Sequence, residues 1–258
     1  TTDWGTTGNW DQSYEPNVNT ESPIIANATP YPVISSDDGA SNDGNVLLED
    51  ITINSGAELT INKDSSLKLV GDFTNNSGTV TLNSDSQNFA SIIVQGTATG
   101  NITYNRFVNI ADMAGEKWDL IGSPVDGLSI SSFVSTNTAS PATLATNGVQ
   151  YAVGVYNNSN NDWSNYTSNG TGAGDVSAAG NFDIGKGYQM GTVSGGTQLL
   201  AFTGSIATSD QLQAIINNHD NGSGGRRFNL VANPFPSYLN LNDDADGTNN
   251  VLSVNSSL

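Results

Sequence analysis

The chain has 258 residues, of which 36% are apolar and only 12% are charged. Its 25 acidic and 7 basic residues give a net charge of −18. A field of this sign repels phosphate backbones and anionic membrane surfaces, so we expect no nucleic-acid partner. The lack of cysteine excludes a disulfide framework, a thiolate zinc site and a cysteine nucleophile. No apolar run approaches the ~18 residues of a membrane span, so we expect no membrane insertion.

Residues 1–45 carry four large aromatic residues among Asn, Pro and Asp, namely Trp4, Trp10, Tyr14 and Tyr31. This composition predicts an irregular N-terminal cap that contains one or two strands. The end of a stack of strands needs such a cap to cover its open edge.

Residues 46–100 repeat one short phrase, in which two alternating apolar residues are followed by Asn, Gly or Ser. The alternating pairs are Ile51 and Ile53, Leu59 and Ile61, Leu67 and Leu69, Val80 and Leu82, and Ile92 and Val94. Alternation with period two predicts strands, and the Gly and Asn residues predict the turns that end them.

Three such strands add up to about 21 residues, which is one coil of a β-solenoid. This spacing places Ile51 near Phe73 and Leu59 near Val80. We therefore predict a short, β-helix-like solenoid in which each strand is covered by its neighbours, and a loop at residues 83–90, where the spacing breaks. A meander of antiparallel hairpins remains the alternative.

Residues 101–240 contain longer strand-like runs separated by Gly, Ser and Asn clusters, which predict an antiparallel β-sandwich or jelly-roll-like domain. Within it, residues 137–148 predict an exposed loop. Residues 209–218 fit a helix or a strand, and we favour the strand because the surroundings are β. Residues 241–258 are predicted to be a linker or the start of a further module, and the predicted fold class is all-β.

Four phrases follow one another along the chain: "GTATGNITYNRFV" (96–108), "KWDLIGSPV" (117–125), "FDIGKGYQM" (182–190) and "FNLVANPFPSYLN" (228–240). In this order they resemble the adhesin-like extracellular proteins of the Bacteroidota that the type IX secretion system exports. The opening "DWGTTGNWD" is similar to the start of such modules. The resemblance implies a secreted or cell-surface β-rich protein, and it carries over no catalytic residues.

These observations lead to a functional hypothesis. We expect a piece of a longer surface protein, a non-enzymatic module for display, adhesion or surface contact, with surface glycans or other extracellular proteins as partners. The alternative is a carbohydrate-binding accessory module of an exported polysaccharide-degrading enzyme. We predict no catalytic residue, and we interpret His219, the only histidine, as a surface residue.

One candidate metal site lies near the end of the chain. Asn242, Asp244 and Asp246 stand at alternate positions before Gly247, an arrangement similar to the first half of a calcium loop. These three are the candidate Ca²⁺ ligands, and a solvated linker is the alternative. The stretch with Asp37, Asp38 and Asp43 is a second, weaker candidate, because its carboxylates offer the same oxygen ligands.

One candidate ligand site surrounds an Asn-rich turn. Tyr156, Trp163 and Tyr166 lie close together in the sequence, and exposed aromatic rings serve as platforms for sugar rings. We therefore name these three residues as a candidate glycan platform. The alternative is a hairpin whose Trp163 packs inward as part of the core.

Overall fold

The structure is a computed structural model that describes residues 3–36, 44–111, 117–141, 143–158, 160–211 and 228–239. Strands dominate these residues, in four sheets, and they contain one α-helix. The predicted β-rich fold is confirmed at this level. The helix lies where the sequence predicted none.

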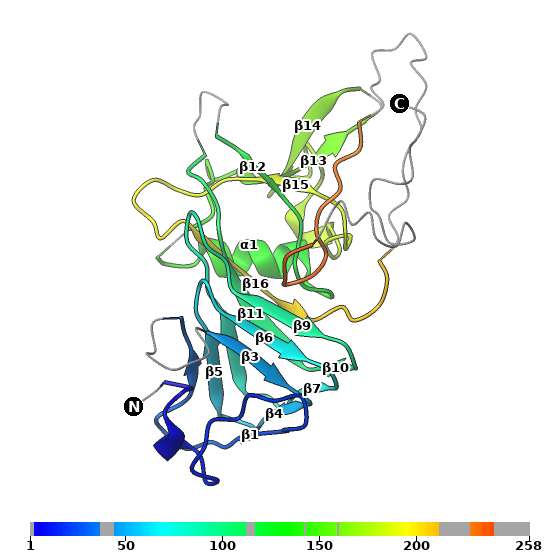
Figure 1. Ribbon diagram of the computed structural model, residues 1–258. Helices are drawn as coiled ribbons and strands as arrows, with labels where there is room; N and C mark the ends of the chain where they lie inside the picture. The colour runs from blue at the N-terminus through cyan, green and yellow to red at the C-terminus, as the bar shows by residue number, and fades with distance from the viewer. Residues whose placement is uncertain are drawn as a thin grey trace.

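The N-terminal half is a stack of short parallel strands (Figure 1). One sheet contains β1 (Ile24–Ile25), β4 (Ile51–Ile53), β7 (Phe73–Asn75) and β10 (Ala98–Thr99). A second contains β2 (Val33–Ile34), β5 (Glu58–Ile61), β8 (Thr79–Leu82) and β11 (Asn101–Phe107). A third contains β3 (Asn45–Leu48), β6 (Ser66–Leu69) and β9 (Ser91–Val94). Each strand thus pairs with the third strand after it in the chain.

The register of the stack follows the counted spacing. Ile51 pairs with Phe73 and Leu59 pairs with Val80, in parallel, as predicted. The strands β1 to β11 pair with one another only in parallel. This part of the described chain is therefore not an antiparallel meander of hairpins.

The inward residues of the three sheets form one core. In β4, β5 and β6 burial alternates with period two, so that the apolar residues point inward and Thr or Lys points outward. Leu59, Ile61, Leu67, Leu69 and Phe73 have no exposed surface. Complete burial of such side chains stabilises a fold by about 1.5–3 kcal/mol each, and a strand of three or four residues gains it only from its neighbours.

Carboxylates follow one corner of the stack. The backbone N–H of Asp72 donates to Asp50 Oδ1 (2.6 Å), and the N–H of Thr97 donates to Asp72 Oδ1 (2.7 Å). The bond from Thr97 holds the pKa of Asp72 below its usual range. A Cβ on Gly71 or Gly96 would lie within 2.4 Å of these carboxylate oxygens, and one on Gly96 would also lie 2.6 Å from the backbone of Gly71, so position 96 requires glycine.

A second corner carries stacked amides. Asn83 Nδ2 donates to Asn62 Oδ1 (3.3 Å), and Asn105 Nδ2 donates to Asn83 Oδ1 (3.1 Å). Such ladders of identical amides stabilise stacked strands, because each side chain repeats the bond of the coil before it. These polar residues therefore have structural partners.

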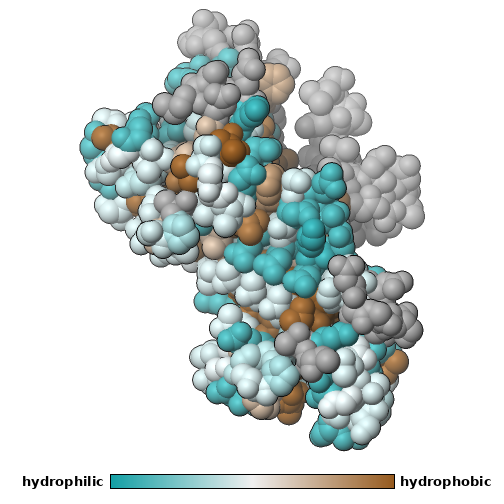
Figure 2. Space-filling model, turned by 90° about the vertical axis from the view of Figure 1, so that its left-hand side faces the viewer, coloured by the Kyte–Doolittle hydropathy of each residue, from teal (hydrophilic) through white to brown (hydrophobic). Residues whose placement is uncertain are grey.

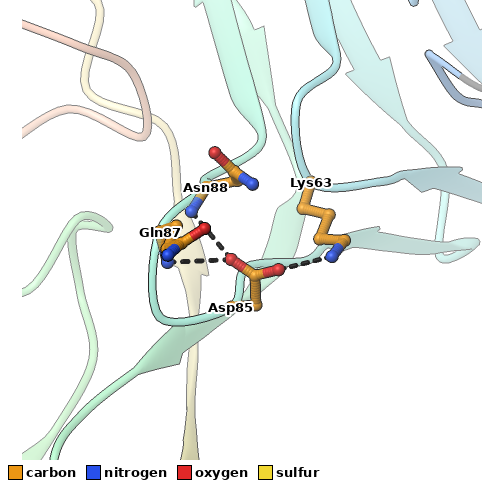
Figure 3. Close-up of polar contacts among 4 residues, drawn as sticks. All are labelled: Lys63, Asp85, Gln87 and Asn88. Carbon is orange, nitrogen blue, oxygen red and sulfur yellow. Dashed lines mark hydrogen bonds and ion pairs between the residues drawn. The ribbon is translucent and has the colours of Figure 1, made fainter.

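Residues 83–90 form the predicted loop between β8 and β9 (Figure 3). Asp85 Oδ1 accepts the backbone N–H groups of Gln87 (2.9 Å) and Asn88 (2.8 Å), and its other oxygen forms an ion pair with Lys63 of the preceding coil. Asp85 thus closes its own turn and ties the loop to the stack.

The pKa of Asp85 is lowered from 3.8 to about 2 by the hydrogen bond from Lys63 and by the two backbone donors. Since the folded pKa is the lower one, the contribution of Asp85 to stability is present above pH 3.8 and is lost as the pH falls through about 2. We expect Lys63→Met to raise this pKa and Lys68→Met to leave it unchanged. The ¹³C shift of the Asp85 carboxyl carbon, followed by NMR during acid titration, measures both, and equal pKa values in all three proteins would contradict the assignment.

The predicted boundaries at residues 45 and 100 fall inside continuous sheets. β1 and β2 lie within the predicted cap and already pair with β4 and β5. At the other end β11 pairs in parallel with β8 and in antiparallel fashion with β16 (Leu199–Ser205). The stack therefore spans residues 24–107, and β16 covers the last edge of its second sheet.

The C-terminal half contains an antiparallel sheet and the helix. The sheet has the order β12 (Asp119–Ile121), β15 (Tyr188–Met190), β13 (Gln150–Asn157), β14 (Asp162–Thr167). The helix α1 (Ile130–Thr138) lies between this sheet and β16 (Figure 1). Two short 3₁₀ helices, η1 (Thr7–Asn9) and η2 (Val176–Ala178), complete the described elements.

Helix α1 begins where Ser129 accepts the N–H of Ser132 (3.0 Å), an N-cap. Its buried residues Ile130, Phe133, Val134 and Asn137 follow helical spacing. Phe133 packs on Phe202 of β16 at 4.8 Å between ring centroids and on Phe182 at 5.2 Å. The helix thus covers residues 137 and 138, the start of the segment predicted as a loop.

The segment 230–238, which ends with the phrase "NPFPSY" (233–238), joins the two halves. Residues 230–232 bond to residues 185–187 next to β15, and the carbonyl of Pro236 accepts the N–H of Ile92 on β9 (2.8 Å). Pro234 and Pro236 are buried, whereas Tyr238 is 68% exposed. The segment therefore covers the edge of the third sheet of the stack.

Candidate functional site

The first candidate surface is the hairpin β13–β14. Tyr156 and Trp163 are directly paired across it, with ring centroids 5.3 Å apart. Tyr156 Oη donates to Asn161 Oδ1 in the turn (2.8 Å), which fixes the tyrosine ring. Both rings are half-buried, so each keeps an accessible part on the same face of the sheet.

Tyr166 does not join this pair. It lies three residues after Trp163 in β14, and residues an odd number apart point to opposite faces of a strand. The side chain is 8% exposed, and burial raises the pKa of its phenol. The structure therefore brings together Tyr156 and Trp163 and places Tyr166 in the core.

The second candidate surface is an open groove at the N-terminal end of the stack, with a volume of about 690 Å³. Its lining includes Trp10, Tyr14, Pro16 and the strand β1. Trp10 is held in place, because its Nε1 donates to the carbonyl of Trp4 (2.9 Å) and its ring meets that of Trp4 edge-on at 4.7 Å. The sequence predicts no groove here, and only the aromatic residues within 1–45 pointed to this surface.

Other candidates lie outside the described residues. These are the proposed calcium ligands Asn242, Asp244 and Asp246, the acidic stretch with Asp37, Asp38 and Asp43, and His219. Within the part of the chain that the structure describes, no three His, Cys, Asp or Glu side chains form a group that could hold a metal ion. Calcium binding at 242–246 stays a prediction.

The face shown in Figure 2 is mostly hydrophilic or neutral where it is coloured, and its hydrophobic residues occur in small groups. In the described ranges, no helix is long and apolar enough to cross a membrane.

The fold and these surfaces define a class: a β-rich protein with a stack of parallel strands and exposed aromatic residues at its two ends. Over residues 1–256 the chain matches the family described as Domain of unknown function (DUF8693), and it belongs to that family. No curated protein and no solved structure matches it.

Proposed function

We propose that this chain is a non-enzymatic module of a secreted or cell-surface, adhesin-like protein that serves display, adhesion or surface contact. Residues 24–107 act as a short β-solenoid, and the C-terminal half acts as a sandwich-like body attached to its end. The four phrases that resemble the Bacteroidota proteins support export by the type IX secretion system.

The observation that carries the proposal is the parallel stack with its constant register. Successive coils repeat the same backbone pairings, the same buried apolar positions and, at the corners, the same carboxylate and amide bonds. Each coil of such a stack contacts only its neighbours, so the stack extends along one axis. An extended stack suits a module that holds binding faces apart.

An adhesion assay tests this role. Beads carrying the folded chain should be retained under flow on glycan-coated or protein-coated surfaces more than beads carrying an acidic protein of similar charge. Retention on no surface would contradict the contact role, and release of reducing sugar ends or peptides from a surface would contradict the non-enzymatic one.

A second candidate function is carbohydrate binding as an accessory module. The pair of Tyr156 and Trp163 favours it, because two adjacent rings on one face, beside Asn161 and Asp162, combine a stacking surface with polar groups.

On a glycan array, we expect Trp163→Ala to lower saturable glycan binding by about tenfold, which corresponds to roughly 1.4 kcal/mol. Tyr238→Ala is the matched control, since it removes an exposed aromatic ring that lies in neither candidate surface. The array is read with Ca²⁺ and with a chelator, because the sequence predicts a calcium loop. Equal binding by both variants and the unaltered protein would argue against a platform on this hairpin.

A further inference from the structure

The cap closes the outer edge of two of the three sheets at the N-terminal end. On β2, the N–H of Trp4 donates to the carbonyl of Val33 (2.9 Å), and Asp3 forms a parallel bridge with Val33. On β3, the N–H of Leu47 donates to Asn17 Oδ1 (2.8 Å). Just beyond β3, the N–H of Glu49 donates to the carbonyl of Glu21 (2.9 Å).

The third edge, that of β1, stays open. The carbonyls of Pro23 and Ile25 accept the N–H groups of Thr52 (3.1 Å) and Asn54 (3.0 Å), which places them toward β4. The backbone groups of Ile24 point the other way, because successive residues of a strand alternate in direction. Among the described residues none bonds to them, and the Ile24 side chain is 63% exposed. An unpaired donor and acceptor next to an exposed apolar side chain form a template for an added strand.

The open edge forms one wall of the N-terminal groove. Residues 23–26 line it together with Trp10, Tyr14 and Pro16. The groove therefore combines the backbone hydrogen-bonding groups of a strand edge with apolar and aromatic side chains. This combination suits an extended polypeptide, whose backbone pairs with the strand edge while its alternate side chains make apolar contacts.

The charge of the groove selects its occupant. Asp11 and Glu21 are in the lining, and the described lining contains no Lys or Arg. The whole chain carries a charge of −18, so a second copy is repelled and a cationic segment is attracted.

We propose that the edge of β1 and the N-terminal groove bind an extended, basic peptide segment of a partner protein as an added strand. This names the partner for the contact role proposed above and rests on that role. Alternate side chains of the segment lie over Trp10 and Tyr14, and its Lys or Arg residues lie near Asp11 and Glu21.

Fluorescence anisotropy with labelled peptides tests the proposal. The probe is an alternating Val-Lys peptide of about ten residues, the upper length of ordinary strands. Its controls are the Val-Glu peptide and a Val-Lys peptide N-methylated at alternate residues, which keeps the charge and loses the backbone donors. We expect saturable binding of the first and at least about tenfold weaker binding of both controls.

Two variants at one position locate the site. Ile24→Pro removes the outward N–H and no bond to β4, as proline does on an edge strand, and we expect it to weaken binding about tenfold or more. Ile24→Ala keeps the N–H and should weaken binding less. Circular dichroism and urea unfolding establish that both variants fold.

Equal affinity of Ile24→Pro and the unaltered protein would overturn the proposal, as would equal binding of the N-methylated peptide. A glycan that binds and is lost on Tyr14→Ala, with no peptide binding, would assign the groove to sugars instead. If peptide binding fails while beads still adhere, only this inference is lost; if the beads fail to adhere to any surface, the contact role itself is lost.

Discussion

Ile92→Ala should lower the free energy of unfolding by about 2–5 kcal/mol, while Ile93→Ala next to it should lower it by about 1 kcal/mol or less. Both residues are in β9, but Ile92 is 1% exposed and Ile93 is 43% exposed. Ile92 pairs with Leu67 in the core, whereas Ile93 lies beside Lys68 on the outer face. The two substitutions remove the same atoms, so the difference measures burial inside the stack alone.

Urea unfolding of the two variants, followed by tryptophan fluorescence and by circular dichroism, gives both free energies. The stacked arrangement requires the larger loss for Ile92. Equal losses, or a larger one for Ile93, would mean that the inward and outward faces of β9 are assigned the wrong way round.

Gly100→Ala should be the second strongly destabilising substitution, with a loss of roughly 2–5 kcal/mol. Gly100 joins β10 to β11 with a φ of +86°, and an added Cβ would lie 2.2 Å from the backbone oxygen of Asn75. Both the left-handed conformation and the contact with the preceding coil are therefore incompatible with a side chain.

Gly127→Ala is the matched control. Gly127 has a similar φ of +76°, but no atom lies within 4 Å of an added Cβ. It should lose about 1–2 kcal/mol, the cost of the left-handed conformation alone. The excess at Gly100 then reports the close approach of two coils, and urea unfolding that shows no excess would contradict this packing.

The stack could be predicted because its information is local and periodic. Alternation assigns inward and outward residues, turn residues mark the ends of strands, and counting from Ile51 to Phe73 or from Leu59 to Val80 gives the register, which the structure confirms. What counting missed is the first coil, since β1 and β2 have only two residues each and their pattern is hidden among the prolines and asparagines of the cap.

The helix was missed for a different reason. Ser, Thr, Val and Asn dominate α1, and their intrinsic helix propensity is low. Tertiary contacts outweigh that propensity: Asn137 exchanges hydrogen bonds with Ala201 of β16, and Phe133 fills the space between β16 and Phe182. The spacing of Ile130, Phe133, Val134 and Asn137 was a usable signal after the capping Ser129.

The candidate surfaces divide in the same way. Because β14 is a strand, Trp163 and Tyr166, which are three residues apart, point to opposite faces of the sheet. That Tyr166 is not part of the platform therefore follows from the sequence alone. The groove does not, because residues 9–32 contribute to it from loops whose positions depend on the coils they cover.

Periodicity along the chain thus accounts for the parallel strands and their register, and composition accounts for the net charge of −18, since each depends on neighbouring residues or on simple counting. The three-dimensional arrangement alone places α1 between two sheets, pairs Tyr156 with Trp163 and leaves the edge of β1 open beside Trp10. The reason is physical: propensity and alternation act within a few residues, whereas closing an edge or filling a space depends on segments that meet only after the chain has folded.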